Sequence, residues 1–124
     1  LDDRYFAKEL PHKFKFGKNN LQNDQLTFHF AVGNDWWFHA KQAPGSHVIV
    51  RTNGAELPDT TFEEAARLAA YYSSMRGSDK VEIDYVEKKQ VKKPGGGKPG
   101  FVVYYTNYSM VIDSNISQIR LCAD

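Results

Sequence analysis

Residues 61–76 are the one segment of this sequence with a complete helical pattern. Thr61 and Glu64 have the spacing of a capping box, in which two side chains bond backbone amides at a helix start. Apolar residues then recur on one helical face, and Gly77 is a typical residue just beyond a helix end. The apolar positions are Phe62, Ala65, Ala66, Ala69 and Tyr72. We therefore expect one main helix over about residues 61–76.

Most other segments have the alternating or continuous apolar patterns that are typical of strands. Three turn signals separate them, namely Gly33-Asn34-Asp35, Pro44-Gly45 and Asn53-Gly54. We expect a short, half-exposed strand at residues 13–17, strands at 36–40, 46–51 and 81–91, and a hairpin formed by residues 101–105 and 110–112.

Residues 19–32 are ambiguous, because Leu26, Phe28 and Phe30 alternate like a strand but also suit a short helix. Side chains that cap helices gather before them, and this favours a short helix over about residues 21–31. Helices and strands intermingle without a βαβ rhythm. The predicted class is therefore α+β, a single small domain with a mostly antiparallel sheet, one main helix and one short helix.

The composition sets broad limits on the function. The chain has 124 residues, enough for one domain with a modest core. Its apolar runs are far shorter than the about 20 residues of a membrane helix, so we expect no membrane partner. Sixteen Lys and Arg against fifteen Asp and Glu give a net charge of +1. A nucleic-acid partner would therefore have to be recognised from the distribution of the charges.

The ends of the sequence suggest a domain taken from a longer protein. Residues 1–12 are mixed in charge and are interpreted as a linker or the end of a preceding coiled coil, followed by a domain over 13–124. The first residues contain neither an initiator Met nor a secretion signal. The single cysteine, Cys122, fits a reducing compartment.

Residues 88–98 are the most distinctive local feature for binding. They contain five lysines and no acidic residue, and the lysines are Lys88, Lys89, Lys92, Lys93 and Lys98. Glycines at 95–97 would let the backbone approach phosphates. A solvated loop between two strands is the alternative interpretation. A nucleotide P-loop is excluded. Its pattern needs a Gly five residues before the Gly-Lys pair and a Ser or Thr after it, whereas Gly97-Lys98 has Lys92 and Pro99 at these positions.

Asp35, His39 and His47 form the only cluster with possible metal or acid–base chemistry, although their spacing matches no familiar zinc pattern. The alternative is structural: Asp35 accepts bonds from turn amides, and both histidines are partly buried near the same edge. Ser46 lies beside His47, but neighbours on a strand point to opposite faces. We therefore expect no catalysis, no cofactor and no metal.

Four segments occur in an order that resembles one family. They are residues 17–24 (GKNNLQND), 35–40 (DWWFHA), 44–48 (PGSHV) and 91–100 (VKKPGGGKPG). Over residues 14–112 the chain is similar to the RNA-binding domain of NFACT proteins, NFACT-R, in the family of RqcH, NEMF and fibronectin-binding proteins. The resemblance also implies a helix over roughly residues 21–31.

The resemblance implies a cytoplasmic role in ribosome-associated quality control. Family members bind large ribosomal subunits obstructed by peptidyl-tRNA, recruit tRNA and support the addition of an alanine tail. The expected partners are tRNA, the large subunit and other domains of the full-length protein. The alternative functions are a fibronectin-binding surface adhesin, with fibronectin as partner, and an enzyme built on Asp35, His39 and His47.

The predicted RNA-binding residues combine the motif positions with nearby cations. They are Lys18, Asn19, Asn20, Asn23, Asp24, Asp35, His39, Lys41, Ser46, His47, Arg51, Lys92, Lys93 and Lys98. We expect the lysines of 88–98, with Lys18 and Arg51, to form one basic face. Acidic residues are expected on the side of the main helix, at Glu56, Asp59, Glu63 and Glu64.

Overall fold

The computed structural model describes residues 14–119. The linker predicted for residues 1–12, Cys122 and both outer limits of the predicted domain lie outside the described residues. Within the described part, no helix has the length and apolar character needed to cross a membrane.

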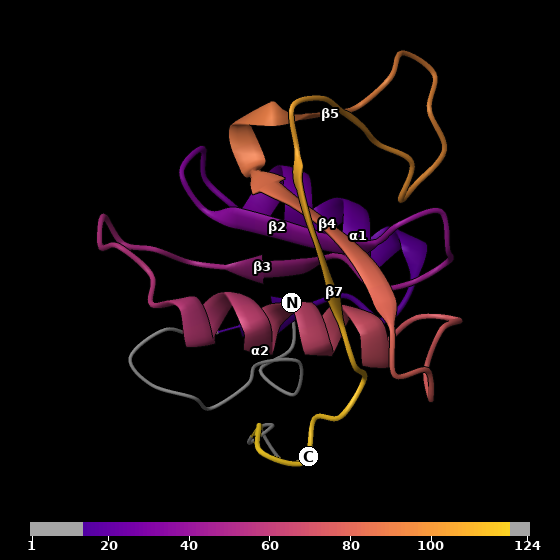
Figure 1. Cartoon of the computed structure of the whole chain (residues 1–124). Helices are drawn as coiled ribbons and strands as arrows, with labels where there is room; N and C mark the ends of the chain where they lie inside the picture. The colour runs from indigo at the N-terminus through magenta and orange to yellow at the C-terminus, as the bar shows by residue number, and fades with distance from the viewer. Residues whose placement is uncertain (1–13, 120–124) are drawn as a thin grey trace.

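The described residues form an α+β domain around an antiparallel sheet of five strands, as predicted (Figure 1). The sheet order is β1-β3-β2-β4-β7, and a separate two-stranded sheet pairs β5 with β6. The strands are β1 (Phe14–Phe16), β2 (Trp36–Ala40), β3 (Val48–Val50), β4 (Val81–Glu87), β5 (Val91–Lys92), β6 (Val103–Tyr104) and β7 (Tyr108–Ile112). The helices are α1 (Asn20–Gln25), its π-helical continuation η2 (Leu26–Phe30), α2 (Asp59–Tyr71) and the 3₁₀ turn η3 (Lys88–Gln90).

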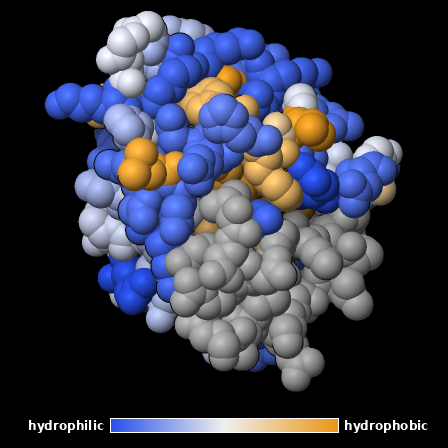
Figure 2. Space-filling view, turned by 180° about the vertical axis from the view of Figure 1, so that it is seen from behind, coloured by the Kyte–Doolittle hydropathy of each residue, from blue (hydrophilic) through white to orange (hydrophobic). Residues whose placement is uncertain are grey.

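Both faces of the sheet are covered, and successive side chains of β2 reach different cores. Phe38 packs in the larger core with α2, whereas Trp37 packs in a second core with Leu26 of η2 and Val91 of β5. Seen from behind, the surface is largely hydrophilic and its apolar residues form small patches (Figure 2). Because of this double covering, all three residues of β1 are buried, and the prediction of a half-exposed strand there is wrong.

The short helix predicted at 21–31 is confirmed as α1 and η2, and its start shows why the clustered asparagines indicated a helix. Asn19 Oδ1 accepts a bond from Gln22 N (2.9 Å), while Gln22 Oε1 accepts one from Lys18 N (2.9 Å). These reciprocal bonds satisfy backbone amides that the first helical turn leaves without partners.

The main helix is confirmed, but the predicted capping box is wrong. Pro58 is the N-cap residue, so Thr61 lies inside α2. The helix also ends at Tyr71, earlier than predicted, because backbone groups of the next residues form hydrogen bonds with the loop of residues 44–46 instead of continuing the helix. Ser46 N donates to Tyr72 O and Ser74 N donates to Pro44 O, both at 2.9 Å. This contact joins the end of α2 to the loop between β2 and β3.

Two strand predictions are corrected by the pairing. The strand predicted at 81–91 is interrupted by η3, which is held against the start of β2 because Lys88 N donates to Asp35 O (2.8 Å). The predicted hairpin of residues 101–105 and 110–112 does not form. Instead β6 pairs with β5, and β7 pairs with β4. Residues 91–104 therefore leave the main sheet and fold beside α1.

We predict that Gly45→Ala destabilises the domain by about 1–3 kcal/mol through overpacking. A Cβ at Gly45 would lie 2.8 Å from Ser73 Cβ and 3.1 Å from Tyr72 O, where the loop meets the end of α2. The matched control is Gly95→Ala, because a Cβ at Gly95 meets nothing within 4 Å. Urea denaturation of both variants measures the difference, and equal stabilities would contradict the prediction.

Candidate functional site

All four motif segments meet at one groove of about 520 Å³ on the α1 side of the sheet. Asn20 and Asn23 come from the first segment, His39 from the second, His47 from the third and Gly100 from the fourth. The other lining residues are Gln42, Ala43, Pro44, Gly45, Pro99, Phe101, Val102 and Tyr104. The groove is therefore assembled from parts of the chain that are far apart in sequence.

Asn23 joins α1 to the 44–48 segment. Its Oδ1 accepts a bond from His47 N (3.0 Å), and its Nδ2 donates to Gly45 O (3.3 Å). The side chain is buried. Gly17 permits this approach, because a Cβ there would lie 2.4 Å from Asn23 Oδ1. The amide of Asn23 is thus used in shaping the groove.

Asp24 fastens the glycine-proline loop to α1. Its Oδ1 accepts bonds from Lys93 Nζ (2.6 Å) and Gly100 N (3.0 Å). Lys93 Nζ also donates to the carbonyl oxygens of Lys98 and Phe101. Burial alone would raise the pKa of Asp24, but the Lys93 ammonium and the Gly100 amide together hold it below its usual value. The charge of Lys93 is therefore neutralised within the fold.

His39 and His47 lie side by side, as the strand–loop–strand prediction indicated. Their ring centroids are 5.4 Å apart in an edge-to-face arrangement, and His47 Nδ1 is 2.8 Å from Thr27 Oγ1. Burial and the neighbouring His39 lower the pKa of His47 to about 3. Burial also lowers the pKa of His39. Both rings are accordingly neutral near pH 7, and neither adds positive charge to the groove.

Asp35 lies away from the two histidines, at the other end of β2. It is fully buried and accepts bonds from Val32 N (2.9 Å) and Thr52 N (3.2 Å), with Arg51 Nε at 3.5 Å. This confirms the structural interpretation of Asp35. Within residues 14–119, no group of three His, Cys, Asp or Glu residues is placed to hold a metal ion.

Three other predicted residues lie outside the groove lining. Arg51 Nη2 donates to Phe30 O (2.6 Å), and its guanidinium stacks on the Phe30 ring at 3.9 Å. Lys41 forms an exposed ion pair with Glu82 (3.3 Å). Ser46 is buried at the junction with α2 described above. The guanidinium of Arg51 is thus occupied by Phe30 and Asp35, so Arg51 does not extend the expected basic face.

Lys92 and Lys98 are the exposed cations of the loop beside the groove. Neither side chain forms an ion pair with any residue of the described range, in contrast to Lys93 and to Lys89, which lies 3.5 Å from Glu87. Lys18 and Asn20 are also exposed, at the start of α1. Together with Asn19, whose exposed side chain caps α1, these four residues are the members of the predicted set, apart from the ion-paired Lys41, that are exposed in segments lining or adjoining the groove.

Three further residues support the groove without having been predicted as part of the site. Tyr104 OH donates to Asp84 Oδ2 (2.6 Å), and the Tyr104 ring lies 4.8 Å from that of Trp37. Burial and the Asp84 carboxylate raise the pKa of Tyr104. Thr27 bonds His47, as noted above. Because these partners are 20 residues apart in each case, no local pattern could have identified them.

Residues 4–106 match the family described as the NFACT protein RNA binding domain. The chain belongs to this family. This NFACT domain is 49% identical over 102 residues to the protein named Rqc2 homolog RqcH of Streptococcus suis, a match covering 82% of the chain and 18% of that protein. It is 45% identical over 96 residues to the Rqc2 homolog RqcH of Bacillus subtilis, covering 77% of the chain and 16% of that protein.

A solved structure agrees with the NFACT assignment. It is the C-terminal part of the fibronectin/fibrinogen-binding protein from Streptococcus suis, with a TM-score of 0.86 and 42% sequence identity. The alignment covers 95% of this chain and 49% of that one. The NFACT domain thus spans less than a fifth of the two RqcH proteins and about half of the solved chain.

We predict that Asp35→Ala destabilises the NFACT domain by about 3 kcal/mol, because two backbone amides and Arg51 lose a buried acceptor. The control is Asp113→Ala. Asp113 also pairs with an arginine, Arg67 (3.3 Å), but its side chain is 40% exposed, so the expected loss is about 1 kcal/mol or less. Chemical denaturation compares the two. A stability loss at Asp35 no larger than that at Asp113 would refute the buried-acceptor role.

We also predict that the domain loses stability as the pH falls below about 6.5. His47 is protonated near pH 6.5 in the unfolded chain but only near pH 3 in the folded one, so its stabilising contribution is complete above 6.5 and decreases toward 3. The slope from one such group reaches about 1.4 kcal/mol per pH unit. His39 acts in the same direction.

The test is urea denaturation between pH 7.5 and 5.0. His47→Gln should flatten the profile, whereas His29→Gln, at an exposed position of η2, should leave its slope unchanged. A wild-type stability that stays constant over this interval would show that the two rings are protonated without cost in the folded state.

Proposed function

We propose that this domain is the RNA-contacting module of a ribosome-associated quality-control factor. Its targets are tRNA and the large ribosomal subunit, in the cytoplasm, and the full-length factor supports alanine-tail addition to stalled chains. The observation that carries the proposal is the assembly of the four NFACT segments into one groove, with the exposed lysines Lys92 and Lys98 in the adjoining loop. Membership of the family, and the names of its relatives, support the same function.

The proposed contacts fall into two groups. Lys92 and Lys98 act on phosphates, with Lys18 and Asn20 at the neighbouring rim. Exposed lysines such as Lys92 and Lys98, which form no ion pair with a described residue, release counterions when they meet a phosphate, and this release drives RNA binding. The buried members of the predicted set act indirectly: Asn23 holds the groove in shape, and Asp35 holds the turn before β2. No catalysis is assigned to the domain, because peptide-bond formation belongs to the ribosome.

Aromatic residues near the lysines add a surface for unpaired bases. Phe101 is 62% exposed and Tyr105 is 71% exposed, and Phe101 lines the groove directly after Gly100. Bases of single-stranded RNA stack on such rings. The lysines and these two rings together favour an RNA segment with splayed bases over a regular duplex.

The alternative function is binding of fibronectin. It is supported by the name of the solved Streptococcus suis protein, the fibronectin/fibrinogen-binding protein. The two functions can be separated with the same variants.

We predict that Lys92→Ala with Lys98→Ala weakens binding of the chain to tRNA and to isolated large subunits. The slope of log affinity against log salt should fall by about 0.7–0.9 for each phosphate contact removed, for all RNA sequences alike. Stability should hardly change, since exposed lysines contribute little to folding. Lys80→Ala, an exposed lysine before β4 that does not line the groove, is the matched control.

Lys93→Ala serves as the contrasting variant, because it should lower stability through loss of the Asp24 pair. Unchanged affinity and salt slope in the Lys92/Lys98 double variant would remove the lysine loop from the RNA site. Saturable binding of the chain to immobilised fibronectin, lost in the double variant, would favour the adhesin function instead.

A further inference from the structure

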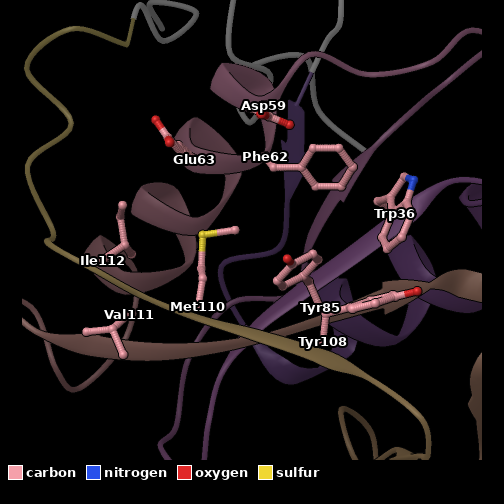
Figure 3. A pocket seen from close by; sticks show the side chains of 9 residues that line it. All are labelled: Trp36, Asp59, Phe62, Glu63, Tyr85, Tyr108, Met110, Val111 and Ile112. Atoms are coloured by element: carbon pink, nitrogen blue, oxygen red, sulfur yellow. The ribbon is translucent and has the colours of Figure 1, made fainter.

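A second cavity lies on the α2 side of the sheet, opposite the groove. It has a volume of about 480 Å³ and opens between α2 and β7 (Figure 3). Four aromatic rings line it, together with Met110, Val111 and Ile112 of β7. The rings belong to Trp36, Phe62, Tyr85 and Tyr108. None of the residues proposed to contact RNA lines this cavity.

The four rings form a cage. The Trp36 centroid lies 5.0 Å from that of Phe62, 5.9 Å from that of Tyr85 and 6.1 Å from that of Tyr108. Tyr85 and Tyr108 are stacked at 5.6 Å. The interplanar angles range from 30° to 79°, so the rings pack on one another in different orientations beside the cavity. Ring faces carry negative electrostatic potential and attract cations.

Two carboxylates of α2 complete the lining. Asp59 and Glu63 are one helical turn apart and both are exposed. Figure 3 shows Asp59 beside Phe62 and Glu63 further along α2, with its carboxylate pointing away from the rings. Neither forms an ion pair with a residue of the described range. No lysine or arginine is among the lining residues. The nearby Arg67 of α2 is already paired with Asp113 (3.3 Å).

The pKa of Tyr85 also reflects the negative character of the cavity. Burial raises the pKa of Tyr85, and Tyr108 and Asp59 raise it further, since each disfavours a second negative charge at this place. The cavity is thus an apolar cage with a negative rim. Such an environment favours a cation with an apolar stem and disfavours phosphate.

We propose that this cavity binds a lysine or arginine side chain from a basic segment of another protein. The methylene stem would pack on Met110 and the rings, and the charged end would lie against Asp59 and Glu63. The volume is that of a small ligand pocket and suits one long side chain. Because β7 is the edge strand of the sheet, an extended segment can reach the cavity without opening the fold.

The test is an NMR titration of the ¹⁵N-labelled chain with the peptide acetyl-GSGRGSG-amide and with its citrulline counterpart. Citrulline keeps the shape of arginine but removes its charge. The arginine peptide should shift the Trp36 indole N–H and the amides of β7, and the citrulline peptide should not. Trp37 is fully buried on the other face, so its indole signal serves as an internal reference.

Variants then separate the rings from the charges. Asp59→Asn with Glu63→Gln, and separately Tyr108→Ala, should each weaken the arginine peptide at least about fivefold. Tyr108 is 59% exposed, so its loss leaves the fold intact, and Tyr108→Phe should retain binding. The matched charge control is Asp79→Asn, at an exposed turn outside the cavity.

Three results would overturn the proposal. The first is equal binding of the arginine and citrulline peptides. The second is an affinity unchanged in both the carboxylate double variant and Tyr108→Ala. The third is a shift of Trp36 by a single-stranded RNA oligonucleotide comparable to that caused by the peptide. Loss of RNA binding in the Lys92/Lys98 variant bears only on the groove, so the two proposals fail independently.

Discussion

Two neighbouring side chains of α1, Asn23 and Asp24, hold the two loops between which the groove lies. Asn23 bonds the backbone of Gly45 and His47, and Asp24 bonds Lys93 and Gly100. Both walls of the groove therefore depend on where α1 starts. That start is set by the reciprocal bonds of Asn19 and Gln22 and by the absence of a side chain at Gly17. If α1 began one residue earlier or later, Asn23 and Asp24 would move, and both walls of the groove would be displaced together.

This arrangement changes how the polar motif residues are understood. Asparagine, aspartate and histidine in a small polar motif suggest direct contacts with a ligand, and the sequence alone predicts them as RNA-binding residues. In the structure, the side chains of Asn23, Asp35 and His47 are buried, and their bonding capacity is used by nearby backbone and side-chain groups. Buried polar groups need such partners, because an unsatisfied one costs about 1–3 kcal/mol. In the function proposed above, RNA would meet the exposed lysines and rings beside the groove.

The sequence alone correctly predicts the features that depend on residues close together in the chain. The asparagine cluster indicated a helix start, and the strand–loop–strand pattern placed His39 beside His47. Prediction from the sequence failed where contacts between distant residues determine the structure. The end of α2 is set by residues 44–46, some 26 positions earlier, and the hairpin prediction failed because β7 finds β4 as partner. Contacts between residues so far apart in sequence produce no local periodicity from which they could be predicted. The hydrogen bond between Tyr104 and Asp84 is another such contact.

Strand β2 carries two consecutive tryptophans that belong to different sites. Trp36 is part of the aromatic cage, whereas Trp37 packs against His39 and His47, which line the groove. Because neighbours on a strand face opposite ways, a single peptide bond separates a ring that lines the cavity from a ring that packs behind the groove. Any displacement of β2 at one site must therefore move the other. Were the two ligands to influence each other's affinity, thermodynamic linkage would require the influence to be equal in both directions, with this strand as its shortest physical route.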